Sequence, residues 1–229
     1  MTLENLYLSM KMEFRPTKNF GKMDTDFKSL INQPGFFPYY NGSFEIHEDD
    51  YEIPKNCILV FGQDWGTVTQ YNNLKEKNRN NGEGKNPTFD NLYDLIGNYN
   101  WKNSIFLSNV FMGLRNGGKS TGENPEISNP IYRKKCESFL EIQLNTLNPK
   151  CVIVLGKVPF KFIAETTGCH FNEIKNYREH YKTHKEIIHY EFKSMNINLC
   201  AIPHVSHRLR NYKEIDPQTV KLLDKISQL

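Results

Sequence analysis

The stretch of residues 136–156, CESFLEIQLNTLNPKCVIVLG, carries the clearest signal of the fold. Its first part belongs to an amphipathic helix that we predict over residues 132–147. Four apolar side chains share one side of this helix: Phe139, Leu140, Leu144 and Leu147. The Asn148-Pro149 pair ends the helix, and residues 151–155 follow as an uninterrupted apolar strand. A helix that leads directly into a wholly apolar strand is typical of a parallel sheet buried on both faces.

The same pattern of apolar strands and amphipathic helices recurs on both sides of this stretch. Further buried strands are predicted at residues 57–61, 104–110 and 198–202, and further helices at residues 90–99, at residues 160–165 and from Pro217 onward. Such alternation predicts an α/β fold, a three-layer sandwich in which helices cover both faces of a mostly parallel sheet. Functional side chains are then expected just beyond the carboxyl ends of the strands.

Composition and charge narrow the class of protein. The 229 residues carry 29 Lys and Arg against 26 Asp and Glu, which excludes a polybasic binder but permits a local basic face. No run of about 18 apolar residues predicts a membrane span, and charges interrupt the N-terminal segment, so we expect a cytoplasmic protein without a signal peptide. We interpret residues 1–50 as an N-terminal extension that packs on the main domain, residues 51–229.

The five cysteines predict neither a disulfide framework nor a metal site. Cys57, Cys151 and Cys200 lie in apolar runs, and no two cysteines have the C-x-x-C spacing. We interpret the cysteines as reduced core thiols, and we expect no zinc, no iron–sulfur cluster and no other cofactor.

Residues 113–120, GLRNGGKS, match the phosphate-binding pattern G-x-x-x-x-G-K-[ST]. A true phosphate-binding loop opens a helix directly after its Lys-Ser pair, whereas here Gly122, Pro125 and Pro130 disfavour a helix. We therefore interpret residues 113–130 as a long glycine-rich loop, and a nucleotide-binding enzyme that uses residues 113–120 stays as a weaker alternative.

Two predicted strands end in residues of chemical interest. Asp64, within Gly62-Gln63-Asp64-Trp65-Gly66, can position a water or stabilise a developing cation, although an aspartate in such a loop is also a common turn residue or helix cap. Asn109 offers a donor and an acceptor together, which suits the edge of a nucleobase. An amide satisfied within the protein is the alternative interpretation of Asn109.

The last strand is followed by a histidine and a basic cluster. His204 can donate to a developing anion, although a loop histidine with internal partners is the alternative. Four basic side chains follow it and can meet phosphates: His207, Arg208, Arg210 and Lys213. Residues 175–193 are also basic, but glutamates interrupt them, so we interpret that segment as a solvated face.

Taken in order, these segments resemble the uracil-DNA glycosylase superfamily. Gly62-Gln63-Asp64 is similar to the first motif of that family, the strand ending at Asn109 resembles its base-reading segment, and residues 136–156 are similar to its helix–strand unit. Residues 204–206, His-Val-Ser, resemble the closing motif. The resemblance spans about residues 54–212. It implies a four-stranded parallel sheet with flanking helices, and an enzyme that hydrolyses an N-glycosidic bond in DNA after flipping the nucleotide out of the stack.

The resemblance also implies roles for individual residues. Asp64 would orient the attacking water, while His204 and the backbone around Gln63 would stabilise the charge on the departing base. Asn109 would read the base edge. Phe89, with Tyr71 behind it, is the candidate to stack on the base, although a core aromatic at a helix start is an equal alternative. The candidates for contact with DNA form one segment, in which Arg208 or Leu209 is the wedge: Ser206, His207, Arg208, Leu209 and Arg210.

The chain departs from the family pattern at three positions. Trp65 and Val205 stand where prolines are usual, and Gly66 stands where classical uracil enzymes place a tyrosine that blocks C5 substituents. We therefore hypothesise that the substrate is uracil or a C5-modified pyrimidine, in base-excision repair or in defence against phage with modified DNA. The alternative is a catalytically inactive DNA- or base-binding member of the same fold. In either case we expect a monomer.

Overall fold

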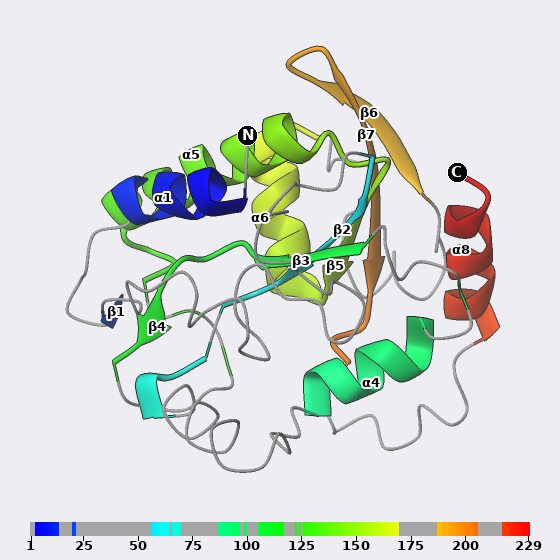
Figure 1. Ribbon diagram of the computed structural model, residues 1–229, viewed down its shortest axis with the longest axis horizontal. Coiled ribbons are helices and arrows are strands. Elements are labelled where there is room, and N and C mark those ends of the chain that lie inside the picture. The colour runs from blue at the N-terminus through cyan, green and yellow to red at the C-terminus, as the bar shows by residue number, and fades with distance from the viewer. Residues whose placement is uncertain are drawn as a thin grey trace.

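The computed structural model describes part of the chain in detail (Figure 1). The described residues are 3–13, 20–21, 56–64, 66–69, 87–96, 99, 105–116, 122, 124, 126–169, 187–205 and 217–229.

A five-stranded sheet forms the centre of the molecule. Its strands are β3 (Ile105–Asn109), β2 (Ile58–Gly62), β5 (Cys151–Leu155), β7 (Met195–Ile202) and β6 (Ile188–Phe192), in that spatial order. The first four are parallel, and each corresponds to a strand predicted from an apolar run. Because parallel strands share one direction, their carboxyl ends meet at the same edge of the sheet.

The fifth strand, β6, pairs antiparallel with β7 and was not predicted. Its side chains alternate, with Phe192 buried and His189 and Glu191 exposed, which is the period of a strand with one covered face. Lys193 and Ser194 close the hairpin with φ angles of 48° and 65°, the left-handed geometry of a tight two-residue turn. The charged segment of residues 175–193 was interpreted as a solvated face, and its described members His189, Glu191 and Lys193 are exposed, while Phe192 between them is buried.

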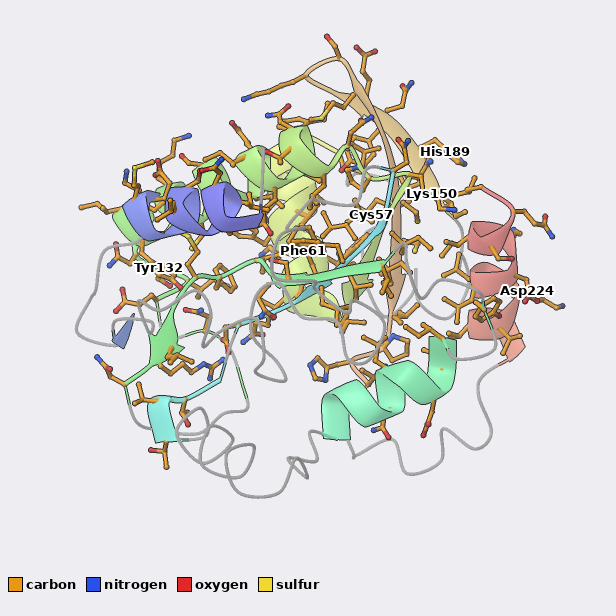
Figure 2. All side chains as sticks on the ribbon, viewed as in Figure 1. Cys57, Phe61, Tyr132, Lys150, His189 and Asp224 are labelled. Atoms are coloured by element: carbon orange, nitrogen blue, oxygen red, sulfur yellow. The ribbon has the colours of Figure 1, made fainter. Side chains whose placement is uncertain are left out.

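One face of the sheet is covered by α1 (Leu3–Glu13), α5 (Pro130–Leu147) and α6 (Lys157–Thr167) (Figure 1). Leu59, Phe61 and Val154 point into this layer, and Figure 2 shows Phe61 between the strands and these helices. Local signals explain the bounds of α5, because the Asn129 side chain accepts from the first free N–H groups and Asn148 ends the helix with φ 40°.

The other face is covered by α4 (Pro87–Ile96) and α8 (Pro217–Ser227). Ile58, Val60 and Ile153 point into this second layer, the alternate positions of the same strands. Two helical layers around a mostly parallel sheet confirm the predicted three-layer α/β fold, with five strands in place of four. Within the described residues, no helix has the length and apolar character to span a membrane.

Two N-terminal elements contact the main domain. Leu6 of α1 is fully buried in the core beside α5, and the Lys135 Nζ atom lies 3.0 Å from a Glu13 carboxylate oxygen. Strand β1 (Phe20–Gly21) pairs antiparallel with β4 (Leu114–Arg115). Strand β4 lies within residues 113–130, which were predicted to be loop throughout, so that prediction is wrong for Leu114 and Arg115.

Candidate functional site

The carboxyl ends of the parallel strands bring Asn109 and His204 to one edge of the sheet, each beside a glycine. Gly62 is the register partner of Asn109, and a Cβ atom at position 62 would overlap Asn109 Oδ1. Just beyond the ends of β5 and β7, a Cβ atom at Gly156 would lie 3.4 Å from the Cβ of His204. Gly62 therefore leaves the space that the Asn109 amide occupies, whereas the reason for glycine at position 156 is its φ of 95°, which L side chains rarely adopt.

The segment after β2 is tied to the segment after β3 by backbone hydrogen bonds. Val110 N donates to Gly62 O at 3.0 Å, and Phe111 N donates to Gln63 O at 2.9 Å. Further along, Arg115 N donates to Gly66 O at 2.9 Å. Gly66 has a φ of 77°, which an L side chain rarely adopts, so this tight return of the chain depends on glycine. These bonds fix the backbone on both sides of Asp64.

Asp64 is held in a buried ion pair with Arg115 of β4. Its Oδ2 atom accepts from Arg115 Nη2 at 2.5 Å and from Arg115 Nε at 3.0 Å. The two side chains are 4% and 6% exposed, for Asp64 and Arg115 respectively. The other oxygen, Oδ1, accepts from Gly66 N at 3.2 Å. These hydrogen bonds hold the Asp64 carboxylate in place at the end of β2.

Gln63, predicted to contact a base, uses its amide nitrogen within this network. Gln63 Nε2 donates to Asp64 Oδ2 at 3.1 Å and to Gly122 O at 2.8 Å. Arg115 Nη2 donates to the same Gly122 carbonyl at 3.1 Å. The carbonyl of Gly122 therefore joins the glycine-rich loop to both side chains that hold Asp64.

His204 lies beyond the end of β7, where its side chain reaches the surface. The protein around the ring still desolvates the imidazolium form, which lowers the pKa of His204, while the negative charge of Asp64 partly offsets that shift. The neutral imidazole therefore predominates at pH 7. Because the charge of Asp64 acts on the ring, the two predicted catalytic side chains belong to one electrostatic environment.

Tyr132 of α5 contacts the segment between β3 and β4. It extends from the helix toward the segment that carries β4, and its hydroxyl donates to the Met112 carbonyl at 2.7 Å (Figure 2). Burial is the main cause that raises its pKa, and the Asp64 charge contributes. Its ring stacks near Phe111 with centroids 6.3 Å apart. A neutral, packed phenol thus supports the strand that holds Arg115.

The first turn of α4 approaches the segment of His204. Asn91 Nδ2 donates to Val205 O at 2.8 Å, so the start of α4, where Phe89 stands, is tied to the residues after β7. The side chain of Phe89 lies outside what the structure describes, as do Tyr71 and all five predicted DNA contacts: Ser206, His207, Arg208, Leu209 and Arg210. Their predicted roles stay predictions.

The site residue that the sequence did not predict is Arg115. It stands inside the phosphate-binding pattern of residues 113–120, yet its guanidinium contacts a carboxylate. Lys119 of that pattern lies outside the described residues. The sequence shows only that Arg115 follows one predicted strand and that Asp64 follows another. This pattern is too common to identify an ion pair.

Neither the cysteines nor the acidic and histidine side chains of the described part assemble a metal site. All five cysteines are buried free thiols, and desolvation raises the pKa of Cys57 and of Cys136 to about 12 each. Among the described residues, no group of three or more His, Cys, Asp or Glu side chains is placed to hold a metal ion.

Comparison with protein families matches residues 78–226 to the model of the Uracil DNA glycosylase superfamily. The matched span includes Asn109, Arg115 and His204, whereas Gln63 and Asp64 precede it. A search of curated proteins found no match. The match covers more than half of the 229 residues and agrees with a parallel sheet whose strand ends carry the predicted site, and the chain therefore belongs to the uracil-DNA glycosylase superfamily.

Proposed function

We propose that the protein is a monofunctional DNA glycosylase, a cytoplasmic monomer that hydrolyses the N-glycosidic bond of a flipped-out pyrimidine. The observation that carries the proposal is that Asp64, Asn109 and His204 stand at the carboxyl ends of three parallel strands of one sheet, in a chain of this family. An acidic group, an amide and a neutral imidazole are the three functions that base excision needs: placing water, reading the base and stabilising its charge.

In the proposed reaction the bond between C1′ of the sugar and the base nitrogen breaks. The bonding electrons leave with the base, and a water oxygen adds to C1′ as that carbon develops positive charge. Asp64 accepts a hydrogen bond from the water and takes its proton as the C1′–O bond forms. The neutral His204 ring donates a hydrogen bond to the base oxygen on which negative charge develops, and the released base anion then takes a proton from solvent. Removing one such donor typically slows an enzyme by about 10²–10³-fold.

The glycine at position 66 supports a substrate beyond uracil. Glycine has no side chain to exclude a substituent at C5, and its φ of 77° opposes replacement by a larger residue. We therefore propose uracil or a C5-modified pyrimidine as the substrate, with base-excision repair and defence against phage carrying modified DNA as the two biological settings.

A catalytically inactive DNA- or base-binding protein is the second candidate, and one observation favours it. The negative charge of Asp64 is compensated by Arg115 at 2.5 Å, so the carboxylate offers less attraction to a cationic sugar than an unpaired one.

One experiment separates the two candidates. The purified protein is incubated with oligonucleotides that contain uracil, thymine, 5-hydroxymethyl or glycosylated pyrimidines, and released bases are identified by mass. We expect release of at least one pyrimidine and an abasic site in the DNA. Binding without release from any oligonucleotide would favour the inactive protein, and release of uracil alone would contradict the C5-modified substrate.

The rate of base release is expected to stay level between about pH 6.5 and 8, where an ordinary imidazole loses its proton. The lowered pKa of His204 makes the neutral ring the predominant form throughout this range, so the rate depends little on its remaining protonation as the pH rises. Single-turnover rates of the wild type and of His204→Ala test this. A wild-type rate that falls about tenfold per pH unit in this range, with no such fall in His204→Ala, would instead assign the donor role to the imidazolium.

A further inference from the structure

Arg115 acts on the carboxylate through one oxygen only. Both of its contacting nitrogens donate to Asp64 Oδ2, and Gln63 Nε2 donates to that oxygen as well. The other oxygen accepts only the longer bond from Gly66 N among the contacts described, at 3.2 Å. Among the contacts described, Oδ2 of Asp64 therefore accepts three hydrogen bonds and Oδ1 accepts one.

The hydrogen bonds to Oδ2 restrain rotation about the Cβ–Cγ bond of Asp64. Rotation about the Cβ–Cγ bond of aspartate is broad, so an unrestrained carboxylate presents either oxygen over a range of angles. With three donors on Oδ2, rotation would break charge-assisted bonds, which are among the strong hydrogen bonds of proteins. Oδ1 is therefore kept as the oxygen with acceptor capacity to spare.

Arg115 is itself held in place by backbone contacts. Its N–H donates to Gly66 O at 2.9 Å, its Nη2 donates to Gly122 O at 3.1 Å, and it lies opposite Phe20 in the pairing of β4 with β1. Because β4 and the Gly122 carbonyl hold the Arg115 guanidinium in place, the guanidinium in turn holds the Asp64 carboxylate in one orientation.

We propose that Arg115 is a positioning residue for base excision, which holds Asp64 so that Oδ1 accepts the hydrogen bond of the attacking water. This inference rests on the proposed function. Arg115 contacts neither the water nor the base in this role, and its effect passes through the orientation of Asp64. Loss of the guanidinium should thus lower kcat and leave KM for DNA unchanged, because orientation of the water matters in the chemical step.

The test compares wild type, Arg115→Ala and Arg115→Lys on the best oligonucleotide of the base-release panel, with guanidinium added at millimolar concentration. Arg115→Ala is expected to lose about 10²-fold in kcat, the typical cost of misplacing a catalytic group by ~1 Å. Added guanidinium should restore part of the rate. Arg115→Lys should fall between the two, since one ammonium cannot reproduce a two-nitrogen contact to Oδ2.

Arg133→Ala is the matched control, because Arg133 forms ion pairs with Glu137 of α5 and Glu165 of α6 and its side chain is 29% exposed. Guanidinium should leave the rate of this variant unchanged.

Two results for a folded Arg115→Ala protein would overturn the inference. The first is a wild-type kcat. The second is a reduced kcat that guanidinium does not restore and that is no lower than the kcat of Arg115→Lys. If Arg115→Ala does not fold, Arg115→Lys decides: a lower kcat at unchanged KM supports the inference, and a wild-type kcat overturns it. A wild type that releases no base overturns the proposed function first, and the catalytic role of Arg115 with it.

Discussion

Asp64→Asn is expected to slow base release by about 10²–10⁴-fold while binding to DNA persists, since this is the usual contribution of a positioned acid–base group. Asparagine keeps the shape of the side chain but loses the negative charge that orients water and stabilises a cationic sugar. Single-turnover release measures the rate, and fluorescence anisotropy with a labelled oligonucleotide measures binding.

The neutral amide also leaves the Arg115 guanidinium without its partner at 2.5 Å, so folding must be checked separately by thermal denaturation. Asp94→Asn is the matched control, because Asp94 is exposed on α4 and the same chemical change there should alter neither rate nor binding. A folded Asp64→Asn protein that releases base at the wild-type rate would remove Asp64 from the proposed mechanism.

Arg115→Met is expected to lower the free energy of unfolding by about 3–5 kcal/mol, the cost of leaving one buried charge without its partner. The Asp64 side chain is 4% exposed, so water cannot replace the lost guanidinium without rearrangement. The double variant Asp64→Asn with Arg115→Met removes both charges, and we expect it to be less destabilised than the sum of the two single variants. Urea denaturation of all three proteins measures these differences.

Arg133→Met is the control for this series. Arg133 lies 3.0 Å from Glu137 and 2.8 Å from Glu165, but its side chain is 29% exposed, and solvent screens such pairs to about 1 kcal/mol or less. Equal destabilisation by Arg115→Met and Arg133→Met would mean that burial adds nothing to the Asp64–Arg115 pair.

The sequence predicted the parts of the fold whose signals are local. The four parallel strands are continuous apolar runs, and the bounds of α5 follow from Asn129, Pro130 and Asn148. Strands β1 and β4 have two residues each and exist through their pairing with each other, about 90 positions apart in the chain. No local pattern could predict them. Their pairing and the burial of Leu6 show that elements before residue 51 contact the rest of the chain, and the division into residues 1–50 as an extension and residues 51–229 as the domain stays a prediction.

The same distinction explains the candidate site. Asp64, Asn109 and His204 could be predicted because they follow strands, and strand ends in a parallel sheet converge by geometry. Arg115 could not, since its role depends on where residues 110–116 return to the loop after β2. The hydrogen bonds of the Gln63 amide to Asp64 and Gly122 could not be predicted either, and the expected role of the backbone around Gln63 at the base stays a prediction.

The contact between Gly62 and Asn109 links the evolution of two positions. Since a Cβ atom at position 62 would overlap Asn109 Oδ1, any larger residue there must be accompanied by a different side chain or rotamer at position 109. A descendant that exchanges Asn109 for a smaller residue is released from that restriction. Gly62 and Asn109 are thus expected to change together, in side chain or in rotamer.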